Sequence, residues 1–166
     1  LTDLSWHSKG EYVVTVCDTK RASAQVTIHH ISKRLSQQPI AFKKDTRVQK
    51  VLFHPTKPVL FVATKKNVNV YHLIKQVKMR QLKSGARWIS SMALHPKGDN
   101  IVLGTYDRRV AWIDLDMSDR PWKTFKYHHR AVRSVSFHRR FPLMATAADD
   151  GVVHVFHARV FDDFAK

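Results

Sequence analysis

The chain contains little cysteine and glycine, and it has no long apolar run. Cys17 is the single cysteine among 166 residues, which excludes an internal disulfide and a cysteine-built metal site and fits a reducing compartment. The five glycines do not cluster, and no phosphate-binding glycine loop or nucleophile elbow is present. The longest apolar run, residues 59–63, cannot span a bilayer. We therefore expect no enzyme, no catalytic residue, no cofactor, no small-molecule substrate and no membrane partner.

Acidic residues are also scarce. There are 13 Asp and Glu against 29 Lys and Arg, which gives a net charge of +16 before the 11 histidines are counted. Hydrophobic residues make up 43%, enough for a packed core, so wholesale disorder is excluded. A charge of this size favours a polyanionic partner, such as nucleic acid, an acidic protein or an anionic membrane. The chain starts without Met or a signal peptide, from which we expect a fragment of a longer chain.

An internal repeat organises the whole chain. Four segments end in histidine, at His7, His54, His95 and His138, and the histidines recur every 41 to 47 residues. Each is followed by a short turn with Gly or Pro, an apolar stretch, a polar turn and a strand with period-2 alternation. These alternating strands are expected at 26–30, 68–72, 110–114 and 153–157. No window has helical periodicity, so the chain is predicted to be all-β, with four strands per unit as in a β-propeller.

The repeats resemble the WD-repeat family. In that family an Asp lies in the second turn and Trp-Asp ends the third strand; here Asp107 and Asp150 match the turn, and Ile113-Asp114 matches the strand end. We expect blades at 1–44, 45–84, 85–127 and 128–166, with the last one incomplete. WD-repeat rings usually have seven blades, so these four correspond to roughly half a WD40-type β-propeller.

The resemblance also implies a structural hydrogen-bond relay. Its members would be His128, Thr146 and Asp150, which would satisfy buried polar groups and fix the turns of the fourth blade. Phe156 stands where the family has Trp, so the last donor of the relay is missing. Blades one and two lack most of the relay and should depend more on apolar packing.

Longer segments are similar to one particular family. They are FHPTKPVLFVAT at 53–64, WISSMALHPKGDN at 88–100, GTYDRRVAWIDL at 104–115 and YHHRAVRSVSFHRRFP at 127–142. Together they resemble the C-terminal propeller of the Bop/Erb family of eukaryotic ribosome-biogenesis proteins. The resemblance implies a non-catalytic nucleolar assembly factor of the large (60S) ribosomal subunit. It also implies partners: pre-rRNA or rRNA, a Pescadillo-type protein, a second WD-repeat protein and other pre-ribosomal proteins.

Apart from the family resemblance, the basic residues are the main indication of function in the sequence. Turns between second and third strands, and links between blades, should lie on one rim; the other turns should lie on the opposite rim. Paired cations on successive turns can follow a phosphate backbone, and such binding is salt-dependent and largely independent of sequence. The residues predicted to contact RNA are Lys43, Lys44, Lys65, Lys66, Arg87, Arg108, Arg109 and Arg130 on the first rim, and Arg139 and Arg140 on the second.

Two aromatic residues accompany these cations. Trp88 lies beside Arg87, and Tyr106 lies close to Arg108, so either ring could stack on an unpaired base or be buried in its blade. The adjacent histidine pairs do not predict a metal site, because neighbouring strand residues point to opposite faces. Since the four repeat histidines occupy one structural position, we assign them to packing or turn capping.

An alternative function is open at this stage. Some WD-repeat adaptors bind acidic or phosphorylated peptides in a basic pocket. Arginines that converge at the centre of the ring would favour that alternative, and a diffuse spread of charge would disfavour it.

Overall fold

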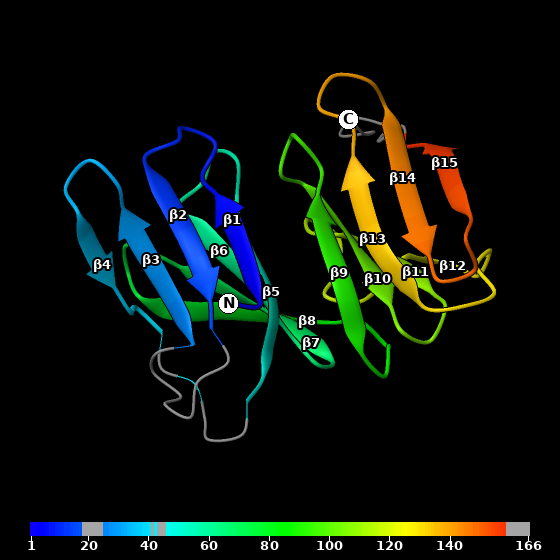
Figure 1. The fold of residues 1–166 in the computed structure, drawn as a ribbon, viewed down its shortest axis with the longest axis horizontal. Helices are drawn as coiled ribbons and strands as arrows, with labels where there is room; N and C mark the ends of the chain where they lie inside the picture. Colours follow the sequence, from blue (N-terminus) through cyan, green and yellow to red (C-terminus); the bar gives the residue numbers. More distant parts are fainter. Residues whose placement is uncertain (18–24, 41, 43–45, 159–166) are drawn as a thin grey trace.

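The computed structural model describes the whole chain except residues 18–24, 41, 43–45 and 159–166. The described residues contain strands and turns but no helix, and therefore no helix that could cross a membrane. Four separate antiparallel sheets follow one another along an arc (Figure 1). The predicted all-β, four-bladed propeller architecture is confirmed.

Each sheet is a meander in which sequential strands pair. The strands of blade 1 are β1 (Asp3–Trp6), β2 (Tyr12–Val16), β3 (Val26–His30) and β4 (Leu35–Gln37). Those of blade 2 are β5 (Val48–Phe53), β6 (Val59–Thr64), β7 (Asn67–His72) and β8 (Val77–Lys83). Those of blade 3 are β9 (Ile89–Leu94), β10 (Asn100–Thr105), β11 (Val110–Asp114) and β12 (Lys123–Phe125). Those of blade 4 are β13 (Val132–Phe137), β14 (Leu143–Ala148) and β15 (Val153–His157).

The fourth blade has three strands among the described residues, and the segment 160–164, which follows them in the sequence, lies outside the described residues. The repeat histidines His7, His54, His95 and His138 each follow the first strand of a blade, which accounts for their regular spacing. First strands of successive blades contact one another, β1 with β5, β5 with β9 and β9 with β13, so they line the inner side of the arc (Figure 1).

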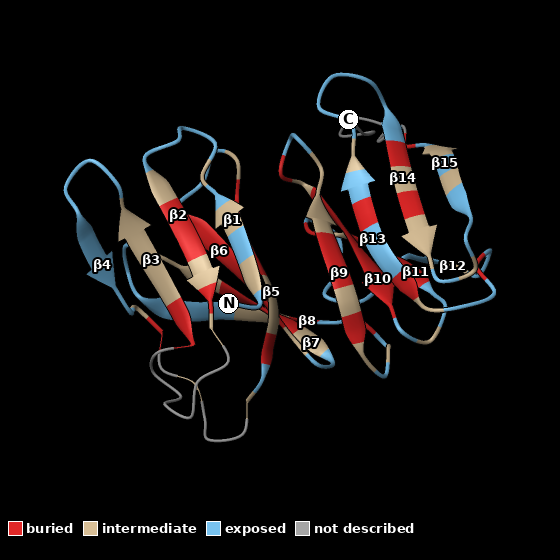
Figure 2. Ribbon diagram, viewed as in Figure 1, coloured by how far each residue is buried: buried red, intermediate tan, exposed pale blue. Residues whose placement is uncertain are grey.

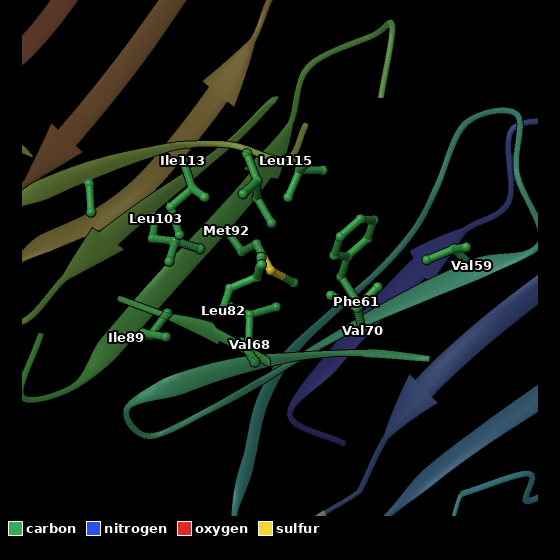
Figure 3. Packing of buried hydrophobic residues seen from close by; sticks show 13 residues of the cluster. Val59, Phe61, Val68, Val70, Leu82, Ile89, Met92, Leu103, Ile113 and Leu115 are labelled. Carbon is green, nitrogen blue, oxygen red and sulfur yellow. The ribbon is translucent and has the colours of Figure 1, made fainter. Parts of the chain in front are cut away.

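The hydrophobic core lies between the blades rather than within any one of them. The largest cluster joins blades 2 and 3, where Phe61, Val70 and Leu82 pack near Met92 and Leu103 (Figure 3). Two further clusters join blade 1 to blade 2 and blade 3 to blade 4. Buried residues therefore concentrate on the middle strands β6, β10 and β11, as Figure 2 shows.

The two end sheets turn apolar side chains to solvent. Trp6 is 58% exposed on blade 1, and Val153 and Val155 are 63% and 65% exposed on blade 4. In a closed propeller the neighbouring blade covers faces of this kind. The sheet faces inside the arc have such neighbours, and the faces at its two ends have none among the described residues.

Candidate nucleic-acid interface

One edge of the arc carries the turns β6–β7, β10–β11 and β14–β15 and the links β8–β9 and β12–β13; we call this edge the first rim. Backbone hydrogen bonds tie its turns to its links. The N–H of Ile89 donates to the carbonyl of Lys65 at 2.8 Å, that of Tyr106 donates to the carbonyl of Trp88 at 3.0 Å, and that of Asp149 donates to the carbonyl of Ala131 at 2.9 Å. The first rim is thus a connected surface across blades 2, 3 and 4.

The first rim holds most of the cations that were predicted to contact RNA. These are Lys65, Lys66, Arg87, Arg108, Arg109 and Arg130, and all of them are exposed. Lys43 and Lys44 lie outside the described residues. Arg109 pairs with Asp107, its Nε lying 3.3 Å from Oδ2. Lys66, Arg87, Arg108 and Arg130 form no ion pair with any residue of the described part of the chain, so their charges are available to a polyanion.

Arg108 adopts a backbone conformation that favours glycine. Its φ is 66°, in the left-handed region, and Gly151 occupies the equivalent turn position of blade 4 with a φ of 78°. A side chain in this region costs about 1–2 kcal/mol. The chain therefore keeps a guanidinium on the first rim at an energetic cost to the turn.

Two adjacent aromatic rings on the first rim are each contacted by a cation. Nζ of Lys65 lies 4.5 Å from the centroid of Trp88, whose ring is tilted against Tyr106 at 5.4 Å. On the other side, the guanidinium of Arg133 lies 4.9 Å from the centroid of Tyr106. We call Lys65, Trp88, Tyr106 and Arg133 the cation–aromatic row; it extends from blade 2 to blade 4.

An ion pair fixes the end of this row. Nε of Arg133 lies 2.8 Å from both carboxylate oxygens of Asp149, and a second guanidinium nitrogen lies 2.6 Å from Oδ2. The hydrogen bonds from Arg133 lower the pKa of Asp149. Sequence reasoning missed Arg133. Its charge and its position next to the apolar Val132 were a signal for exposure, but its contact with Tyr106 depends on the packing of blade 4 against blade 3.

Arg139 and Arg140 lie on the opposite edge, the second rim, in the turn between β13 and β14. There they line a cleft of about 290 Å³ together with His95, Lys97 and His138. The predicted RNA-contacting residues are therefore divided between two edges of the arc, and no single straight strand of nucleic acid along one edge reaches all of them.

The repeat histidines cap turns on the second rim. In three of them Nδ1 accepts a hydrogen bond from a backbone N–H two or three residues later, for example from Lys57 to His54 at 2.9 Å and from Phe141 to His138 at 2.9 Å. Lys9 donates in the same way to His7. In His7, His54 and His138, where Nδ1 accepts, the proton of the neutral ring lies on Nε2. His95 differs, because its Nδ1 lies 3.0 Å from Oδ1 of Asp99 and donates to that carboxylate.

The structure brings His128, Thr146 and Asp150 together. Nδ1 of His128 lies 3.1 Å from Oδ2 of Asp150, and Nε2 lies 2.8 Å from the hydroxyl of Thr146. An ionised carboxylate only accepts hydrogen bonds, so Nδ1 donates to Asp150 and Nε2 of the neutral ring accepts from Thr146. His128 and Thr146 are buried, and the relay links the β12–β13 link to β14 and to the β14–β15 turn.

Backbone groups stabilise the charge of Asp150. Its oxygens accept hydrogen bonds from the N–H of His129 at 2.8 Å and from that of Val152 at 3.1 Å. These bonds, the first above all, lower the pKa of Asp150 to about 2. The carboxylate therefore stays ionised throughout the neutral range and organises the turn around it.

No group of three or more His, Cys, Asp or Glu side chains suited to a metal ion occurs among the described residues. Blade 3 replaces the relay with a different buried hydrogen bond. The indole Nε1 of Trp112 donates to the side-chain oxygen of Asn100 at 2.6 Å. The relay of blade 4 and the Trp112–Asn100 bond of blade 3 each connect parts of one blade, whereas the buried hydroxyl of Ser91 accepts from the N–H of Val135 and joins blade 3 to blade 4.

Comparisons with known proteins agree with this architecture. Residues 119–157 match the family model described as "WD domain, G-beta repeat". A chain of the solved "Crystal Structure of Mitotic Checkpoint Complex" superposes with a TM-score of 0.81 over 96% of this chain and 47% of that chain, at 17% identity. At that identity the likeness concerns the fold alone. Repeats, sheets and turns together define a WD-repeat β-propeller.

Curated relatives match over almost all of this chain. It is 50% identical to "Ribosome biogenesis protein ERB1" of Malassezia globosa, over 97% of this chain and 19% of that protein. It is 48% identical to the protein of the same name from Saccharomyces cerevisiae and 49% identical to "Ribosome biogenesis protein bop1" of Danio rerio, over 98% of this chain in each case. The chain belongs to the Bop/Erb family. It spans about a fifth of the length of these relatives.

Proposed function

We propose that this chain is a non-catalytic scaffold in the biogenesis of the large ribosomal subunit and that its first rim contacts rRNA. The relatives, which are named ribosome biogenesis proteins, support the biological process. The unpaired cations of the first rim support the contact with RNA, and they are the observation that carries the proposal.

The arrangement of the cations fits a long polyanion. Lys66, Arg87, Arg108 and Arg130 come from successive turns and links, so their side chains are displaced around the arc. A phosphate backbone presents charges at regular intervals and can contact several of them, releasing counterions at each contact. The described arginines do not converge on one point, which favours RNA over the acidic-peptide alternative.

Partners and location form the finer part of the proposal. We place the protein in the nucleolus, within pre-60S particles, together with a Pescadillo-type protein and a second WD-repeat protein. The exposed apolar faces of blades 1 and 4 and the rims are surfaces on which protein neighbours can pack. The proposal includes no catalytic step, because the buried polar side chains described above serve the turns.

Charge reversal tests the contact with RNA. The first-rim variant replaces Lys65, Lys66, Arg108 and Arg109 with Glu, and the matched second-rim variant replaces Lys57, Lys75, Arg139 and Arg140 with Glu. Both change the net charge equally. Affinity for structured large-subunit rRNA fragments is measured over a range of salt concentrations.

The first-rim variant should lose most of the affinity and most of the salt dependence, because each phosphate that a cation neutralises adds about 0.7–0.9 to the slope of log affinity against log salt. An equal loss in both variants would show that bulk charge alone attracts RNA. Binding of the unmodified protein that does not respond to salt would contradict the proposal outright. The biological process is tested separately. Sedimentation shows whether each variant still enters pre-60S particles.

A further inference from the structure

We propose that the cation–aromatic row is a binding site for single-stranded RNA, in which one unpaired base stacks on Tyr106 and the flanking phosphates contact Arg87 and Arg108. This inference rests on the proposed function. It adds the class of RNA that binds and the residue on which the unpaired base stacks.

The exposure of the rings selects Tyr106 as the platform. Tyr106 is 41% exposed as a residue, whereas Trp88 is only partly exposed and lies between Lys65 and Tyr106. Trp88 and Arg133 both contact the tyrosine ring, and the residue still keeps an exposed surface. An aromatic ring with an open surface is the element on which proteins stack bases of single strands.

Tyr106 is already held in place before any ligand arrives. The guanidinium of Arg133 covers part of its ring at 4.9 Å, and Arg133 is itself fixed by the bidentate ion pair with Asp149. The backbone N–H of Tyr106 is bonded to the carbonyl of Trp88. Stacking on a ring that is already oriented avoids much of the entropy cost of ordering a mobile side chain.

The charges beside the ring suit phosphates. Arg87 precedes Trp88 and Arg108 follows Tyr106 by two residues, so each cation stands next to a member of the row. Neither forms an ion pair with the described residues. The strained backbone of Arg108 is a second, independent sign, since the turn would accept Gly more readily but carries a guanidinium here.

Single-stranded RNA fits this geometry better than duplex RNA. A paired base inside a helix is stacked on both faces and cannot cover Tyr106, whereas an unpaired base has a free face. An acidic peptide would use the cations but gain nothing from the tyrosine ring. The presence of aromatic rings beside unpaired cations therefore favours single strands.

The experiment compares Tyr106→Ala with Tyr106→Phe in the full-length protein. Affinities for a short labelled oligoadenylate and for a hairpin duplex of similar length are measured by fluorescence anisotropy at fixed salt. Phe141→Ala is the matched control, because Phe141 is 63% exposed and lies on the second rim. Melting curves of all variants check that the fold is intact.

Tyr106→Ala should weaken the oligoadenylate about 5- to 150-fold, the range for loss of one base–aromatic stack. Tyr106→Phe and Phe141→Ala should keep the affinity, and the duplex should respond to none of the three. Ultraviolet crosslinking of the oligoadenylate should yield a nucleotide adduct on the peptide that contains Tyr106.

Several outcomes would overturn the stacking site. They are an unchanged affinity of Tyr106→Ala, an equal loss in Tyr106→Phe, or an equal loss on the duplex. If the first-rim charge reversal still abolishes binding in those cases, the proposed RNA contact stands without the stacking site. An acidic peptide whose affinity falls in Tyr106→Ala while that of RNA does not would assign the row to peptides. No RNA binding by the unmodified protein would remove the proposed function itself.

Discussion

Blades 3 and 4 share a strand register but fix their second strands differently. Leu103 of β10 pairs with Met92 and Ala111, and Thr146 of β14 pairs with Val135 and His154, so the two residues occupy equivalent positions. Both are buried, with Leu103 in an apolar cluster and Thr146 in the polar relay. Val62 holds the same position in blade 2 and is also fully buried.

The face on which this position lies is covered in all three blades. Val62 packs against blade 1, and Leu103 packs against blade 2. Met144, which shares the strand face of Thr146, packs against blade 3. Thr146 differs in that its hydroxyl donates to His128, in the relay that ties the turns of blade 4 together. A repeat can therefore hold either an apolar or a hydrogen-bonding side chain at this position while it keeps the same strand register.

Leu103→Ala should produce the largest loss of stability. The residue is fully buried between blades 2 and 3, and a cavity left by Leu at such a site costs about 2–5 kcal/mol. Urea unfolding followed by circular dichroism measures the change. A loss below about 1 kcal/mol would show that the junction between blades 2 and 3 is not the main core.

Thr146→Val tests the relay blade with an almost isosteric change. The methyl group cannot donate to His128, so a buried ring nitrogen loses its partner, at a cost of about 1–3 kcal/mol. The same unfolding measurement applies. Thr146→Ser, which keeps the hydroxyl that donates to His128, is the control. A Thr146→Val protein as stable as the unmodified one would mean that the relay is dispensable.

A glycine–arginine exchange should have smaller effects of opposite sign in the two blades. Arg108→Gly relieves the left-handed backbone and should stabilise the protein by about 0.5–1 kcal/mol, while it weakens RNA binding. Gly151→Arg should destabilise by about 1–2 kcal/mol through φ alone, because a side chain there meets nothing within 4 Å. Thermal unfolding measures the stability of both variants, and RNA titration measures their affinity. Destabilisation by Arg108→Gly would contradict the strain argument.

The repeat made much of this fold predictable. The histidine spacing and the alternating segments located the first three strands of each blade, because these features are local. The short outer strands β4 and β12 had no comparable pattern. Arg133 was missed for a related reason. Its partner Tyr106 is on another blade, and the contact depends on how two sheets pack.

Blades 2 and 4 should lose stability at different pH values. His54 in blade 2 is buried beneath Gly98, and burial, reinforced by the charge of Lys57, lowers its pKa. Unfolding therefore takes up a proton in mildly acidic solution. The stability that neutral His54 contributes is complete above its ordinary pKa of 6.5 and is lost as the pH falls toward the lowered folded value.

Blade 4 should respond at much lower pH. The pKa of Asp150 is about 2, below its ordinary 3.8, so its contribution is complete above pH 3.8 and is lost as the pH falls toward 2. Urea unfolding at about pH 7.5, 5.5 and 3 should show both steps. His54→Gln should flatten the first step alone and Asp150→Asn the second alone, while replacement of the exposed His157 by Gln should change neither. A first step that survives in His54→Gln would assign the mild-acid sensitivity to another histidine and remove this contrast between blades.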